Sequence, residues 1–193
     1  SVLKDAGRKI FAKIAEDRMD ARTVGYSQKF TSSVIDLILG SPDAYESLLS
    51  MSGKKNYLFD HALNTCTFCI MIGMNLYEAD DIKLFLLGLG GLLHDIGMAS
   101  IDNYILEKSG PLTREERMRI EVHPRHGYEI LKEHDVADEV ANMVLEHHER
   151  FDGSGYPNGL AGSDIDEYAS IVAVADVYDA LTSERSYRKR LTP

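Results

Sequence analysis

Apolar residues recur at intervals of three and four along most of this sequence, the spacing that places side chains on one face of an α-helix. A first segment from Val2 to about Glu16 and a second from about Ser27 to Leu39 both show this amphipathic pattern. A third helix is expected to begin at Ser41-Pro42-Asp43, because serine caps a helix and proline suits its first position. No stretch alternates apolar and polar residues for long, so the pattern predicts an all-α protein.

The middle of the chain carries the most apolar helices. One is expected from about Lys54 to Leu76, with His61 facing the core, and the next from Asp81 to His94. The second is apolar on nearly all sides, which predicts a buried central helix. Its longest apolar run, from Leu84 to Leu93, is too short to span a bilayer, and no membrane or signal segment is expected.

The second half predicts shorter helices and one glycine-rich loop. Thr113 and Glu116 fit a capping box at the start of a helix that leads towards His123. Further helices are expected at about 124–132, 138–146 and 168–181. Residues 150–163 hold four glycines and a proline, so we expect a loop there.

The composition fits one globular unit. With 193 residues and 44% hydrophobic side chains, the chain can bury one sizeable core and is too short for two full domains. A formal charge of −10 argues against a nucleic-acid polymer as partner, although metal ions can reverse the local field and admit a small anion. Because the chain starts at Ser1 and stops at Pro193 without a closing helix signal, we expect a fragment of a longer cytoplasmic protein.

Cys66 and Cys69 form an isolated C-x-x-C pair in a helical stretch. With no second pair and no strand-helix-strand pattern around them, they are more typical of small core residues than of a redox or zinc site. A reducing compartment is the simpler expectation.

A histidine and a carboxylate, His94-Asp95, stand side by side where the central helix ends. Imidazole beside carboxylate suits a divalent transition metal, and the carboxylate is free to bridge to a second ion. Alone, such a pair is more typical of a polar helix end, and the same holds for His147-His148 and for His123. Together the predicted helices supply five imidazoles and two carboxylates, a set that suits two metals: His61, His94, Asp95, His123, His147, His148 and Asp176.

Four motifs surround these residues. They are His94-Asp95-Ile96-Gly97, Leu112-Thr113 with Glu116 and His123, His147-His148-Glu149 with Gly155-Tyr156-Pro157, and Asp176 to Thr182 with Arg185, Tyr187 and Arg188. In these motifs the chain resembles the HD-GYP family of metal-dependent phosphodiesterases, a branch of the HD phosphohydrolase superfamily. The resemblance covers about residues 54–193 and leaves residues 1–53 as an N-terminal helical segment of unknown role. It implies a helical bundle of the HD phosphohydrolase type that binds iron or manganese and hydrolyses cyclic di-GMP to pGpG, GMP or both.

The resemblance also implies roles for individual residues. His61, His94, Asp95 and Asp176 would bind one ion, and Asp95, His123, His147 and His148 the other. Asp95 would be the bridge, with a hydroxide between the two metals as nucleophile, and His94 and Asp95 are the expected catalytic residues.

The Gly-Tyr-Pro loop and two arginines are the expected substrate contacts. Tyr156, between Gly155 and Pro157, suits contact with guanine or phosphate, and the guanidinium groups of Arg185 and Arg188 suit phosphate. In the family this loop is also implicated in docking to diguanylate cyclase (GGDEF) domains.

Three departures from the family pattern leave alternatives open. Tyr57 stands where three-metal members carry a glutamate, so two ions are expected. Met98 replaces a lysine that contacts the scissile phosphate, which favours, as an alternative, a weak or inactive domain that senses cyclic di-GMP or binds a protein. The family domain also normally continues for another helix. A hydrolase acting on mononucleotides is a third alternative. His126 is expected to lie behind the ligands or at the surface, and His134 to be exposed to solvent.

Overall fold

The computed structural model describes residues 2–15, 19–40, 57–78, 80–106, 108 and 110–183, and within them every regular element is a helix. The all-α prediction is therefore confirmed. The helix expected from Ser41, and both Arg185 and Arg188, lie outside the described residues. The elements are α1 (Val2–Ala15), α2 (Ala21–Gly40), α4 (Tyr57–Leu76), α5 (Asp81–Leu93), η1 (Ile96–Ser100), α6 (Asn103–Leu106), α7 (Arg114–Ile120), α8 (His123–Glu133), α9 (Asp138–Glu146), η2 (Gly162–Asp164) and α10 (Glu167–Thr182).

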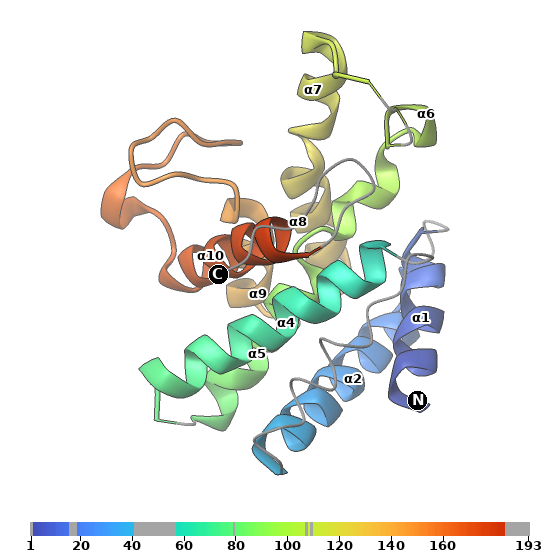
Figure 1. Ribbon diagram of the computed structural model, residues 1–193, viewed down its shortest axis with the longest axis vertical. Coiled ribbons are helices and arrows are strands. Elements are labelled where there is room, and N and C mark those ends of the chain that lie inside the picture. Colours follow the sequence, from blue (N-terminus) through green and yellow to red (C-terminus); the bar gives the residue numbers. More distant parts are fainter. Residues whose placement is uncertain are drawn as a thin grey trace.

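Helix α5 lies at the centre of the bundle, as its apolar sequence predicts. It packs against α4, α2, α9 and α10, and five of its leucines are buried: Leu84, Leu87, Leu89, Leu92 and Leu93. Figure 1 shows α1 and α2 on one side of the α4–α5 pair, with α8, α9 and α10 on the other. The stretch Asp81–Ser100 is apolar enough to cross a membrane by length and composition, but 61% of its most apolar window is buried inside the protein. Such burial is typical of a core helix.

Small residues bring α4 and α5 close together. A Cβ atom on Gly91 would lie 2.9 Å from the Sγ atom of Cys69 and 3.0 Å from the Cα atom of Cys66. Both cysteines are free and fully buried, which confirms that they are small core residues. Because the helix backbones approach closely here, His61 on α4 comes beside His94 at the end of α5, with ring centroids 5.1 Å apart.

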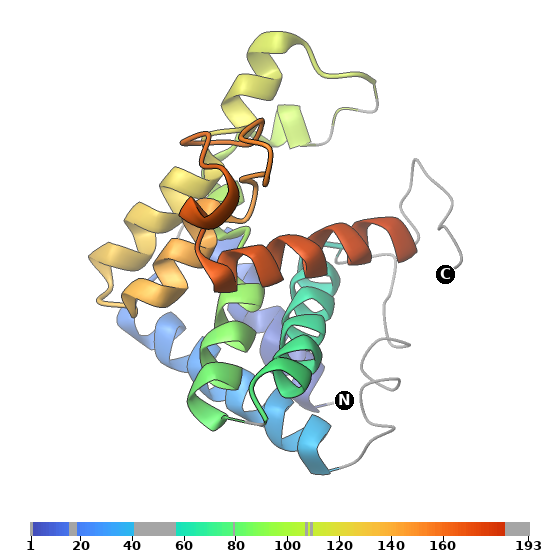
Figure 2. The ribbon, with the colours of Figure 1, turned by 90° about the vertical axis from the view of Figure 1, so that its left-hand side faces the viewer.

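The sequence analysis predicted no element between α5 and the capping box. The segment there forms two short helices, η1 and α6, before the capping box of Thr113 and Glu116 starts α7. Gly97 in η1 packs directly on α8, since an added Cβ would lie 1.9 Å from the carbonyl oxygen of His123 and 2.6 Å from the nitrogen of Gly127. Only glycine allows this approach, and it brings Asp95 beside His123. Figure 2 shows α6 and α7 projecting from the rest of the bundle.

Candidate metal centre

The seven side chains expected as metal ligands come together in two groups. Each group has ligand atoms that all lie within 4.8 Å of one another. The ligands come from α4, the ends of α5 and α9, the start of α8 and the middle of α10. One group is Asp95, His123, His147 and His148, and the other is His61, His94 and Asp176.

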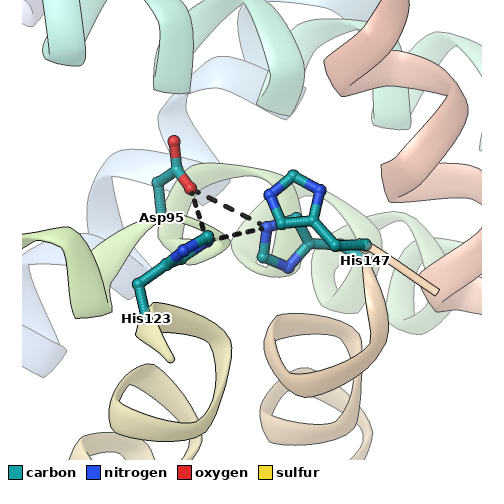
Figure 3. Close-up of side chains that lie close together, drawn as sticks. Asp95, His123 and His147 are labelled. Carbon is teal, nitrogen blue, oxygen red and sulfur yellow. Dashed lines mark hydrogen bonds and ion pairs between the residues drawn. The ribbon is translucent and has the colours of Figure 1, made fainter. Parts of the chain in front are cut away.

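Asp95 lies between the two groups and turns one carboxylate oxygen towards each. Its Oδ1 atom is 3.2 Å from Nε2 of His123 and 3.7 Å from Nε2 of His147. Its Oδ2 atom is 3.5 Å from Nε2 of His94 and 3.8 Å from Nε2 of His61. Figure 3 shows Asp95 facing His123 and His147 across the ends of their helices. This is the arrangement that a carboxylate bridging two ions requires.

Three of the histidines are oriented by the same backbone contact. In each, Nδ1 donates to the carbonyl oxygen three residues earlier, at 2.8 Å for His94, 2.7 Å for His123 and 2.8 Å for His147. Each carbonyl belongs to the last turn of a helix, where carbonyl groups have no partner within the helix. A carbonyl only accepts a hydrogen bond, so Nδ1 carries the proton and Nε2 presents its lone pair to the centre.

These lone pairs fit a cation. The Nε2 atoms of His123 and His147 lie 3.4 Å apart, and both approach Oδ1 of Asp95. Three acceptors that converge in a site where both imidazoles are buried repel one another unless a proton or an ion lies between them. Because imidazole and carboxylate are ligands of divalent transition metals, the donor set fits such ions.

His61 is held by an acid that the sequence analysis did not assign. Its Nδ1 lies 2.6 Å from Oδ2 of Asp179, and its Nε2 lies 3.1 Å from Oδ1 of Asp176. Asp179 is itself fixed by Asn64, which donates to Oδ1 at 2.7 Å, and by Ser183, which donates at 2.6 Å. Carboxylates that hold the far nitrogen of a ligating imidazole are common around metal sites. The available signal was the three-residue spacing from Asp176, which places both acids on one face of α10.

Electrostatics in the centre favour ionised acids. Burial would raise the pKa of Asp95, yet without an ion that pKa is well below its usual value, because a proton held by His94, His123 or His147 on the side facing Asp95 stabilises the carboxylate. Burial likewise opposes ionisation of Asp176, whose pKa is lowered by its bond to His61. Both carboxylates are therefore ionised and can attract cations.

The imidazoles divide into two kinds. Burial lowers the pKa of His61, but bonds to Asp176 and Asp179 outweigh it and raise the pKa to about 10. Burial and the neighbouring His147 and His123 lower the pKa of His148 to about 3. His148 is therefore neutral at pH 7, as a metal ligand must be, whereas an ion at the other group must displace a proton from His61.

The Gly-Tyr-Pro loop is anchored to the ligand His148. The backbone nitrogen of Tyr156 donates to the carbonyl oxygen of His148 at 3.2 Å, and the two rings lie 4.8 Å apart. Gly155 is required, because a Cβ there would lie 2.6 Å from that same oxygen. The buried carboxylate of Glu149 accepts from the backbone nitrogens of Asn158 and Leu160 at 2.7 and 3.0 Å. The sequence analysis quoted Glu149 in a motif but gave it no role.

The two remaining histidines, and the two positions that differ from the family pattern, are not members of the two ligand groups. His126 shares a 2.7 Å hydrogen bond with the hydroxyl of Ser100. His134, expected to be exposed to solvent, is half-buried at the end of α8. Met98 is half-buried in η1, and Tyr57 is the first residue of α4.

The fold and the site define a metal-binding helical bundle of the HD phosphohydrolase type. A family model described as "HD domain" matches residues 46–193, and the chain belongs to this family. A solved structure titled "Bd1817, a HDG"Y"P protein from Bdellovibrio bacteriovorus" matches with a TM-score of 0.80 over 93% of this chain and 59% of that one, at 22% identity, and so shares the fold. These matches and the relatives below confirm the resemblance to the HD-GYP branch.

Curated relatives share the sequence more closely. The cyclic di-GMP phosphodiesterase PA4108 of Pseudomonas aeruginosa is 40% identical over 153 residues, which are 79% of this chain and 37% of the relative. The response regulator RpfG of Xanthomonas campestris, also named a cyclic di-GMP phosphodiesterase, is 48% identical over 52% of this chain and 27% of its own. The 3'3'-cGAMP-specific phosphodiesterase 3 of Vibrio cholerae is 33% identical over 72% of this chain and 30% of its own. The chain thus spans about a third of the length of these relatives or less.

Proposed function

We propose that this chain is the catalytic part of a phosphodiesterase that hydrolyses cyclic di-GMP. The observation that carries the proposal is the placement of Asp95, which turns one oxygen to each of two groups of metal ligands. Relatives named as cyclic di-GMP phosphodiesterases support the choice of substrate. The products are pGpG, GMP or both.

The ions are two per chain, and we propose iron or manganese. Five imidazoles favour these metals over magnesium or calcium, which prefer all-oxygen sites. When bound, the two ions supply activation of a water molecule and of the phosphate that it attacks. The protein holds the imidazoles in the tautomer that binds metal, keeps the bridging carboxylate of Asp95 ionised, and excludes bulk water from the buried His94, His123 and His147.

The substrate contacts lie beside this centre. Tyr156 borders the ligand His148 and offers a ring and a hydroxyl to the nucleotide. Arg185 and Arg188 are proposed to bind the phosphates, by resemblance to the family. Phe151 in the same loop is 83% exposed, which supports the further proposal that the loop docks to GGDEF domains in the cytoplasm.

The experiment is hydrolysis by metal-loaded protein. Protein reconstituted with iron or manganese is incubated with cyclic di-GMP, and the nucleotides are separated by chromatography. We expect linear pGpG or GMP from the native protein and none from Asp95→Asn. Asp164→Asn, an exposed acid in η2, is the matched control and should leave the rate unchanged. Absence of both products with two ions bound would refute hydrolysis of this substrate.

Met98 favours a second candidate, a domain that binds cyclic di-GMP and signals without efficient turnover. Loss of one cation that contacts the phosphate in the transition state costs roughly 2–4 kcal/mol, or a factor of tens to thousands in rate. Calorimetry separates the two functions, because a sensor binds cyclic di-GMP and leaves it intact for hours. Absence of binding would exclude both.

A further inference from the structure

A hollow of about 400 Å³ lies between the Gly-Tyr-Pro loop and α7. It adjoins the metal centre through a single side chain, because the ring of Tyr156 lines the hollow and also packs 4.8 Å from the ring of His148. A nucleotide whose phosphate lay at the metal centre would therefore place its adjacent sugar or base in this hollow, beside Tyr156. The hollow is lined by Leu112, Arg117, Ile120, Glu121 and Tyr156.

An oriented carboxylate stands in this hollow. Glu121 is only 29% exposed, and the Nε atom of Arg117 donates to its Oε1 at 2.7 Å. The two residues are one helical turn apart on α7 and at its end, so the pair is set by the helix. A carboxylate accepts about four hydrogen bonds. Arg117 therefore fixes the direction of Glu121 and leaves most of its accepting capacity for a ligand.

The lining suits a purine base, and the carboxylate suits guanine in particular. Leu112, Ile120 and the ring of Tyr156 supply apolar and aromatic surface on which a base can stack. The Watson–Crick edge of guanine carries two adjacent N–H donors, at N1 and N2, which match the two oxygens of a carboxylate. Adenine presents a lone pair at N1, and a carboxylate repels it.

We propose that Glu121, oriented by Arg117, binds one guanine base of the substrate in this hollow and sets the preference for guanine over adenine. The inference rests on the proposed function for its substrate class and goes beyond it in naming the specificity residue. Some relatives are named for cyclic di-GMP, which has two guanines, and others for 3'3'-cGAMP, which has one. The number of guanine bases that the protein recognises therefore distinguishes these substrates.

A single guanine site has a consequence that can be measured with 3'3'-cGAMP. That molecule has one guanine and one adenine, so the guanine binds in only one of its two orientations. The scissile phosphate is then fixed relative to the guanine, and one linear product, either pApG or pGpA, predominates. Cyclic di-AMP fits in neither orientation.

The experiment compares native protein with Glu121→Gln, which keeps the shape of the side chain and removes the charge. With metal-loaded native protein, we expect one predominant linear product from 3'3'-cGAMP at early times. We also expect cyclic di-GMP to bind about tenfold or more tightly than cyclic di-AMP in calorimetry. With Glu121→Gln, both linear products should form and the difference in affinity should shrink to about twofold. Glu129→Gln, an exposed charge on α8, is the control and should behave as native.

The outcomes separate this inference from the proposed function. In one outcome, native protein prefers cyclic di-GMP to cyclic di-AMP in calorimetry, Glu121→Gln loses this preference, and neither protein hydrolyses a dinucleotide. That result would refute the phosphodiesterase activity and support the guanine site. Hydrolysis of 3'3'-cGAMP to equal amounts of both products by the native protein would refute the guanine site and support the activity. An equal gain in rate for every dinucleotide with Glu121→Gln would show that the carboxylate only repels phosphate, and would also overturn the inference.

Discussion

Asp179 holds His61 across the bundle, with its Oδ2 atom 2.6 Å from the Nδ1 atom of the ring. The two residues are 118 positions apart in the sequence and come from α4 and α10. This contact fixes the nitrogen that faces the centre, because a ring held at Nδ1 directs Nε2 towards Asp176 and His94. The carboxylate also makes the imidazole a stronger ligand.

Asp179→Ala should therefore weaken metal binding at the group of His61, His94 and Asp176 by roughly 10- to 100-fold. The four ligands of the other group do not contact Asp179, so one ion should remain. Titration with manganese, followed by calorimetry, measures the two affinities. Ser170→Ala, an exposed position on α10, serves as control. Unchanged affinity at both sites in Asp179→Ala would contradict the assigned role.

The metal content should be close to two ions per chain, because the structure offers two ligand groups joined by Asp95. Elemental analysis of protein purified without chelator measures it. Asp95→Ala should lose most of both ions, since the bridge serves each, whereas His123→Ala should chiefly empty one group. Removal of the ions by chelator should lower the melting temperature, because ions that bind only the folded state stabilise it. A native value near three would contradict the two-ion assignment.

Met98→Lys should raise turnover of cyclic di-GMP. The residue lies in η1, three positions after Asp95, where the resemblance places a lysine that contacts the scissile phosphate. A cation that acts in the transition state is worth roughly tenfold or more in kcat. Steady-state kinetics of Met98→Lys and of the control Met118→Lys, an exposed position on α7, make the comparison. Equal kcat in native protein and Met98→Lys would show that a side chain at position 98 does not contact the scissile phosphate.

The two cysteines should resist thiol reagents in the folded protein. Both are fully buried, and burial raises the pKa of Cys66 from 9.0 to about 12. Because reagents attack the thiolate, a chromogenic disulfide at pH 8 should titrate both thiols only after guanidinium is added. Rapid reaction of native protein would contradict the burial.

The same pKa shift makes stability depend on pH. Above about pH 9 the unfolded chain releases the thiol proton of Cys66 while the folded chain keeps it until about pH 12. The unfolded state then binds fewer protons, so the free energy of unfolding falls as pH rises through this window. Denaturant midpoints at pH 8 and pH 10 measure the fall. In the double variant Cys66→Ala, Cys69→Ala the free energy of unfolding should fall less between these pH values. An equal fall in both proteins would show that the cysteine thiols do not cause it.

Much of the fold and the ligand set could be predicted from the sequence, for local reasons. Helical periodicity depends on neighbouring residues, so the boundaries of α1, α4, α5, α9 and α10 were expected to within a few residues. The capping box of Thr113 and Glu116 is a contact three residues long and forms as expected. The seven ligands were identified by residue type and by resemblance, and the structure brings them into two groups.

Only the tertiary structure decided how these residues serve one another. Asp179 holds His61, Glu149 holds the Gly-Tyr-Pro loop, and the oxygens of Asp95 divide between two groups, through contacts that no local spacing encodes. Gly97 in the sequence indicates a break after α5, whereas in the fold it permits the contact with the carbonyl of His123 that sets Asp95 beside its partner. The sequence determines which ions the protein can bind, because metal preference depends on the donor atoms of the individual side chains. Three of the imidazoles are also oriented locally, by the carbonyl group three residues earlier. His61 is instead oriented by Asp179, which lies 118 positions away and reaches it only through helix packing.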